Sequence, residues 1–202
     1  LFRILAAPDS GIAAPGDLAG VAIGVSKNTI IEYVTDRILQ ESGLKNGQIV
    51  KQSVPVIPER YQLLLQGRLQ AATIPDPLAM SAVAAGAVQI IEDSKFPRYS
   101  VSVLSFSIDA VSKKRQAVAG FVKAWDRAAW EINAAPESFR LLMLKKIRVP
   151  DNVRETFKIP PFPRRHVPDK SQWADMMKWM VDKGLLETPA SYENCVTSEF
   201  LP

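Results

Sequence analysis

The chain has 202 residues, of which 47% are hydrophobic, so it is long enough for one ordinary domain or two small lobes with a real core. Its net charge of +4, from 25 basic and 21 acidic residues, is small and mostly dispersed, which gives nucleic-acid binding little support. With one histidine and one cysteine, the composition excludes an intramolecular disulfide and a metal cluster of these residues, and it leaves a histidine-based triad only His166, in a proline-rich segment that predicts a surface loop.

The first hundred residues alternate between short apolar runs and helical patterns. Residues 1–7 could be a strand entering from upstream, and residues 8–20 are a connection rich in Pro, Gly and Asp. Strands are predicted at residues 21–25, 49–56, 69–74 and 88–91, and helices at residues 30–42, 58–66 and 78–85. This alternation predicts a parallel α/β lobe with helices on both faces of its sheet.

The second half of the chain is predicted to be mostly helical. Residues 101–111 are expected to be extended, as a strand that crosses out of the lobe. Helices are predicted around residues 118–132, 136–147, 151–157 and 173–183, with an extended proline-rich segment at residues 159–168. Their wide apolar faces have almost no strand in residues 112–202 to cover. We therefore expect these helices to complete a first lobe whose strands lie upstream of Leu1, in a chain that is a fragment or has been trimmed.

This interpretation divides the chain into an entering segment (1–20), an α/β lobe (21–100), and a crossover strand with helices of an incomplete first lobe (101–202). The longest uncharged run, residues 77–91, is too short to cross a bilayer. The first residues show no signal-peptide pattern, which agrees with trimming.

The turn after the first strand of the lobe is the first candidate binding site. Ser26, Lys27, Asn28 and Thr29 lead from a buried strand directly into a helix, which aims backbone N–H groups and the positive end of the helix dipole at one point. Small anions and carboxylate-like groups bind at such points. The alternative is plain capping, because Thr29 followed by Glu32 fits a capping box.

Two further candidates follow the next strands. Asp76 stands between two prolines at the end of the third strand, where ligands bind in open parallel sheets, but Asp before a first-turn proline is also an ordinary N-cap. Arg60 follows the second strand and could reach the same crevice with a bidentate fork for carboxylate, sulfonate or phosphate. A single exposed arginine is more often only solvated.

Three stretches, DLAGVAIGVSKNTIIEYVTDRIL, VIPERYQLLLQGRLQAATIPDPLA and GAVQIIED, together resemble the solute-binding proteins of ABC importers. The group in question contains the nitrate, sulfonate, taurine and thiamine-precursor binders (NMT1/THI5-like, SsuA-like). The similarity lies in the order of motifs: an Asp-Leu-x-Gly turn before a strand, a Ser/Thr-bearing helix start, a leucine helix ending in Gly, a small-residue strand and an acidic-Pro step. It covers residues 8–95 and extends more loosely to the end.

The resemblance implies a hinged, two-lobe protein with the periplasmic-binding-protein type II fold, which captures a small polar solute in an interlobe cleft and passes it to an ABC permease in the membrane. It implies a periplasmic or lipid-anchored location, without catalysis, cofactor or metal. By position, Ser26, Asn28 and Thr29 would contact the solute, Asp76 would line the cleft, and Arg60 would stand in an Ile-Pro-x-Arg step near it. At Gln70 and Asp76 the chain departs from the usual Asp and Glu, so the identity of the solute stays open.

Two other functions are compatible with the same fold. An enzyme similar to the thiamine-pyrimidine synthases would need a dedicated histidine and cysteine cluster, which one residue of each argues against. A ligand-sensing domain of a transcription regulator would carry a helix-turn-helix upstream of Leu1. Within the binding-protein interpretation, a cationic or zwitterionic solute would use Asp76, and an anionic one would use the Thr29 helix start and Arg60.

Overall fold

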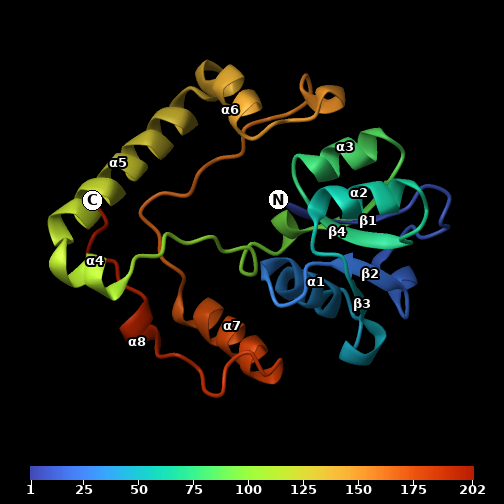
Figure 1. The fold of residues 1–202 in the computed structure, drawn as a ribbon, viewed down its shortest axis with the longest axis horizontal. Helices are drawn as coiled ribbons and strands as arrows, with labels where there is room; N and C mark the ends of the chain where they lie inside the picture. Colours follow the sequence, from blue (N-terminus) through green and yellow to red (C-terminus); the bar gives the residue numbers. More distant parts are fainter. The chain divides into compact units, whose positions relative to one another are not determined.

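The computed structural model describes residues 1–202, which divide into two compact units (Figure 1). Unit 1 consists of Leu1–Ser100 and Val149–Phe157, and unit 2 of Val101–Arg148 and Lys158–Pro202. The structure therefore includes residues 1–20 in the same unit as the α/β lobe. It also returns the short segment 149–157 to unit 1.

Five strands form one mixed sheet in unit 1. They are β1 (Phe2–Ala6), β2 (Ala22–Val25), β3 (Val50–Ser53), β4 (Ala71–Pro75) and β5 (Val88–Glu92), in the spatial order β3-β2-β4-β1-β5. β2 is parallel to β3 and β4, whereas β1 is antiparallel to both of its neighbours, β4 and β5. The α/β class is confirmed, and β2 to β5 share one direction as predicted. The sheet is nevertheless not purely parallel, because β1 is inserted between β4 and β5 in the opposite direction.

The two central strands are buried on both faces. Ile4, Leu5 and Ala6 of β1 are 0% exposed, and so are the residues of β4 from Ala71 to Ile74. Strands with both faces covered consist of nearly continuous apolar residues, because both faces pack against protein and not against water. The apolar start of the chain therefore becomes a central strand.

Three helices cover the two faces of this sheet (Figure 1). α2 (Ile57–Leu65) and α3 (Leu78–Ala84) share a core with Ala72 and Ile74, on one face of β4. α1 (Ile30–Glu41) lies on the other face, where the hydroxyl of its Thr35 is 2.7 Å from that of Thr73. Because successive strand residues point to opposite faces, β4 holds helices on both sides.

Unit 2 is helical. Its helices are α4 (Ile108–Lys113), α5 (Arg115–Ala134), α6 (Arg140–Lys146), α7 (Lys170–Asp182) and α8 (Tyr192–Cys195). Short 3-10 helices occur in the two units at Pro15–Leu18, Asn46–Gln48, Asp93–Lys95, Pro136–Phe139 and Asp151–Val153. The predicted crossover strand at residues 101–111 is wrong: residues 101–107 have no sheet partner, and α4 begins at Ile108 after the N-cap Ser107.

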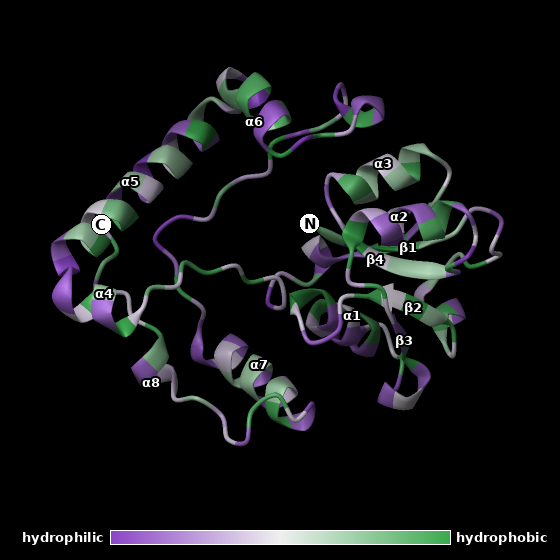
Figure 2. Cartoon of the chain, viewed as in Figure 1, coloured by the Kyte–Doolittle hydropathy of each residue, from purple (hydrophilic) through white to green (hydrophobic).

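The apolar residues of α5 are only partly covered. Val118, Val122 and Ala129 are buried, whereas Phe121 and Trp125 of the same helix are about half exposed at 50% and 48%. Figure 2 shows hydrophobic residues along α5 and α6. None of the helices combines the length and the apolarity needed to cross a membrane.

Polar contacts attach the proline-rich segment to α5. The carboxylate of Asp126 accepts hydrogen bonds from Arg164 at 2.9 and 2.6 Å, and Arg165 lies 3.4 Å away. Asn133 exchanges two hydrogen bonds of 2.8 Å with the backbone of Phe162. Residues 159–168 thus have no helix or strand, as predicted, and are fixed to α5 at Phe162, Arg164 and Arg165.

Candidate functional site

Helix capping builds the turn between β2 and α1. Thr29 is the N-cap of α1, and its hydroxyl accepts the N–H of Ile31 at 3.2 Å and donates to the carbonyl of Ser26 at 2.7 Å. Asn28 precedes it with a φ of 61°, in the left-handed region that Asn tolerates better than most residues. Capping is therefore one role of Thr29 in this structure.

Glu32 supports the turn from inside the unit. Its carboxylate accepts the N–H of Asn28 at 2.7 Å, one residue earlier than the predicted capping box with Thr29 requires. Glu32 is 0% exposed and its second oxygen lies 3.2 Å from Nζ of Lys51 on β3, which also pairs with Asp36. The turn is thus tied through a buried ion pair to the neighbouring strand.

Some donors at the turn remain free after capping. The N–H groups of Thr29 and Ile30 have no acceptor within the chain, as is usual for the first turn of a helix. The side chains of Lys27 and Asn28 are exposed. These groups, at the positive end of α1, form an arrangement that can hold an anion or a polar group.

Arg60 lies behind this turn and is fully buried, contrary to the expectation of an exposed side chain. Its guanidinium donates to the carbonyl of Val54 at 3.0 and 2.7 Å, to the carbonyl of Thr73 at 2.5 Å and to the hydroxyl of Ser26 at 2.5 Å. The Ser26 hydroxyl in turn donates to the carbonyl of Pro55 at 3.1 Å. Arg60 therefore joins the carboxyl ends of β2 and β3 to β4, and burial lowers its pKa to about 10.

Asp76 belongs to a separate cluster at the end of β4. Its carboxylate makes a bidentate pair with Arg3 of β1 at 2.9 and 3.0 Å, and Arg3 also lies 3.1 Å from Glu92 and contacts Gln89. The hydrogen bond to Asp76, followed by the charges of Asp76 and Glu92, raises the pKa of Arg3. The N-cap alternative for Asp76 is wrong, because the N-cap of α3 is Pro77, after a cis Asp76–Pro77 bond, and no side chain caps that helix.

The structure therefore places the five predicted residues in two groups along one edge of the sheet. Ser26, Asn28, Thr29 and Arg60 form the group that we call the β2–α1 cluster. Asp76 joins Arg3 at the opposite side of β4, in the β4–β1 cluster. Sequence reasoning missed Arg3 and Lys51. A single charged residue inside an otherwise apolar strand, as in Phe-Arg-Ile-Leu, is the signal that could have indicated a paired cation.

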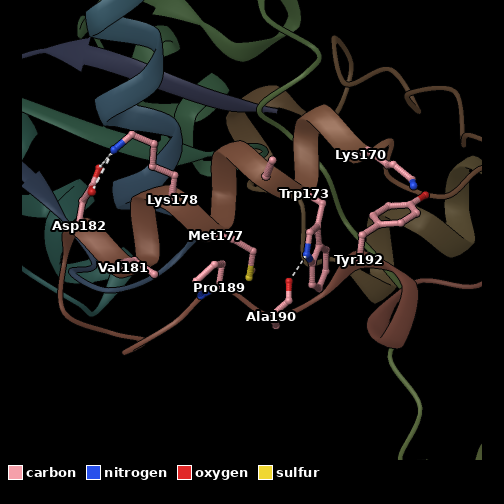
Figure 3. A pocket seen from close by; sticks show the side chains of 10 residues that line it. Lys170, Trp173, Met177, Lys178, Val181, Asp182, Pro189, Ala190 and Tyr192 are labelled. Carbon is pink, nitrogen blue, oxygen red and sulfur yellow. Dashed lines mark hydrogen bonds and ion pairs between the residues drawn. The ribbon is translucent and has the colours of Figure 1, made fainter.

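A pocket of about 530 Å³ lies along α7 in unit 2, and none of the predicted residues lines it (Figure 3). Its floor is apolar, with Trp173 and Met177 among the side chains shown. The polar groups around it are already paired: the indole N–H of Trp173 donates to the carbonyl of Ala190 at 2.8 Å, and Lys178 pairs with Asp182 at 2.8 Å. This pocket therefore lacks the free polar groups that would orient a polar solute.

Comparison with solved structures identifies the fold. The chain superposes on the periplasmic sulfonate-binding protein SsuA from Methylobacillus flagellatus KT with a TM-score of 0.71 and 15% identity, covering 98% of this chain and 63% of that one. For a ligand-binding component of an ABC-type import system from Staphylococcus aureus, the TM-score is 0.76 at 11% identity, with 98% and 69% covered. For the desulfurization enzyme DSZB, it is 0.65 at 16% identity, with 98% and 74% covered. The fold is that of the type II periplasmic binding proteins.

The sequence itself identifies the family. Residues 1–139 match the family model described as NMT1/THI5 like, so the chain belongs to the NMT1/THI5-like family. A search of curated proteins finds no match. The chain spans 63% of the length of the first of the structures named above.

Proposed function

We propose that this chain is the solute-binding part of an ABC importer, located outside the cytoplasm, which binds a small polar solute and delivers it to a membrane permease. The family and the fold support a solute-binding role. The observation that locates the proposed binding site is the set of free N–H donors at the start of α1. They lie beyond the carboxyl ends of β2, β3 and β4.

The five predicted residues take different parts in this proposal. Asn28 and Thr29 are exposed and contact the solute, together with the free N–H groups of the first turn. Ser26 and Arg60 act from behind the turn, because Ser26 is 8% exposed and Arg60 is 0% exposed. Asp76 lines the same edge with its charge engaged by Arg3. A sulfonate, nitrate, taurine or a pyrimidine-like compound is the proposed range of solutes.

A thermal-shift screen of the purified protein tests the binding role. Sulfonates, nitrate, pyrimidines and amino acids are added one at a time. A bound solute stabilises the folded protein by mass action, by about 2.7 kcal/mol at a concentration of a hundred times its Kd, and therefore raises the melting temperature. A screen in which every class leaves the melting temperature unchanged would contradict the proposal. Consumption of a hit during incubation, followed by chromatography, would instead indicate an enzyme, as in DSZB with the same fold.

Asn28→Gly is the sharpest variant for the site. Glycine accepts the φ of 61° and keeps the N–H that donates to Glu32, so only the exposed amide side chain is lost. We expect the melting temperature without solute to stay within a degree or two of that of the wild type, while the shift caused by the solute falls by half or more. Asn46→Gly, in an exposed turn before β3, is the matched control and should leave the shift unchanged.

A further inference from the structure

The position of Arg60 is unusual for a cation. The side chain leaves α2 and is 0% exposed, and its contacts reach Ser26 after β2, Val54 after β3, and Thr73 within β4. Gly24 of β2 provides the space: a Cβ on Gly24 would lie 3.3 Å from Cγ of Arg60 and 2.8 Å from Leu69. The strand is thus adapted to let this side chain pass.

The charge of Arg60 is also uncompensated. All its hydrogen-bond acceptors are carbonyls and a hydroxyl, and no carboxylate forms an ion pair with it. Two other partly buried cations of unit 1 have acidic partners: Arg3 pairs with Asp76 and Glu92, and Lys51 pairs with Glu32 and Asp36. With a pKa of about 10, Arg60 remains a cation at neutral pH.

Two positive sources therefore act on the same turn. The N-terminal end of α1 contributes its free N–H groups and dipole, and Arg60 contributes a full charge that bonds directly to Ser26. The hydroxyl of Ser26 donates its hydrogen to the carbonyl of Pro55 and accepts one from Arg60. Ser26 therefore holds Arg60 in place behind the turn and has no hydrogen left to donate to a solute. Low-dielectric surroundings increase the effect of such a charge on a neighbouring group.

We propose that Arg60 is a positioning residue that makes the β2–α1 cluster select anionic solutes, by holding an unpaired buried charge behind the turn without touching the solute. This inference rests on the proposed binding function and adds the charge class of the solute. In the β4–β1 cluster, the carboxylate of Asp76 that a cationic solute would need is already engaged by Arg3.

The test compares anions with neutral molecules of similar shape. Calorimetric titrations use methanesulfonate and methanesulfonamide, benzoate and benzamide, and orotate and uracil. The proteins are the wild type, Arg60→Met and Arg68→Met. Arg68 is exposed and precedes β4 at the opposite edge of the sheet, so its variant has the same net charge as Arg60→Met.

We expect the wild type to bind at least one anion about tenfold more tightly than its neutral counterpart. Arg60→Met should remove most of this preference: the Kd for the anion should rise, and the Kd for the neutral molecule should stay within about threefold of its wild-type value. Arg68→Met should leave the Kd for both molecules within about twofold of the wild-type values. If Arg60→Met weakens both members of a pair equally, or leaves the preference intact, the proposal is overturned and Arg60 only supports the fold.

The remaining outcomes are also decisive. Tighter binding of the neutral member by the wild type would overturn the anion assignment and leave the proposed binding function standing. Binding of none of these six compounds, nor of any compound in the screen, would contradict the binding function itself. Should Arg60→Met not fold, Arg60→Lys decides, because it keeps the charge behind the turn and must therefore keep the preference for the anion; loss of that preference would overturn the proposal.

Discussion

Arg3 and Arg60 reach the same edge of one sheet, in opposite electrostatic settings. Arg3 is partly exposed and engages two carboxylates, whereas Arg60 has no exposed surface and engages none. Pairing neutralises the charge of Arg3 and leaves one excess negative charge beside it, whereas the absence of a carboxylate partner preserves the positive charge of Arg60. The comparison shows that the electrostatic potential at this end of the sheet depends on which partners the arginines have, and not only on which residue types are present.

Truncation of the two arginines should give the largest difference. Arg60→Ala should lower the free energy of unfolding by about 3–5 kcal/mol, because it opens a cavity and leaves buried acceptors at Val54 and Thr73. Arg3→Ala should cost only about 1 kcal/mol, since Asp76 and Glu92 remain 13% and 22% exposed to water. Urea unfolding of both variants measures the difference, and equal losses would show that burial of Arg60 has no special role.

Lys51 lies between these two cases, with acidic partners that are more deeply buried. Lys51→Met should cost about 2–3 kcal/mol, because it removes the cation that pairs with Glu32 and Asp36, two acidic residues at 0% and 5% exposure. Chemical denaturation at pH 7 checks this value. Addition of Glu32→Gln should restore part of the lost free energy of unfolding. If the loss in the double variant equals the sum of the losses in the two single variants, Lys51 and Glu32 are not coupled.

Asp126 of unit 2 provides the smallest and most local effect. Its hydrogen bond from Arg164, then the charges of Arg164 and Arg165, lower the pKa of Asp126. This contact is therefore fully formed above the ordinary Asp pKa of about 3.9 and is lost as the pH falls through the lowered value. Amide exchange of residues 159–168 should accelerate in that range in the wild type and show no such pH step in Asp126→Asn. Asn133→Ala is the control, because it loosens the same segment without a titrating group and should keep the step.

The parts of the fold that local patterns encode could be predicted from the sequence. Periodicity and caps located α1 and α2, and the strand-to-helix turn at Thr29 was identified together with its capping alternative. The direction of β1 could not be predicted, because its apolar residues suit either orientation and its partners lie about seventy or more positions away, at residues 71–75 and 88–92.

The site was harder to predict because it depends on burial and pairing. Arg60 looked exposed, since arginine seldom enters a core and Gly24, which makes room for it, has no distinctive pattern. Asp76 looked like a cap or a ligand, and its actual partner, Arg3, is distant in sequence. Residues 101–107 looked like a strand because alternation was visible, but a strand also needs an edge to pair with.

The place of β1 in the sheet has a further consequence for how the molecule holds together. β5 pairs with β1 alone, and β1 lies between β5 and β4. β1 therefore joins two strands that come much later in the sequence to each other. Removal of Phe2–Ala6 would expose one edge of β4 and detach β5 from every hydrogen-bonded neighbour. A short peptide of the same residues could then pair with both β4 and β5. This sheet is therefore a candidate for strand complementation.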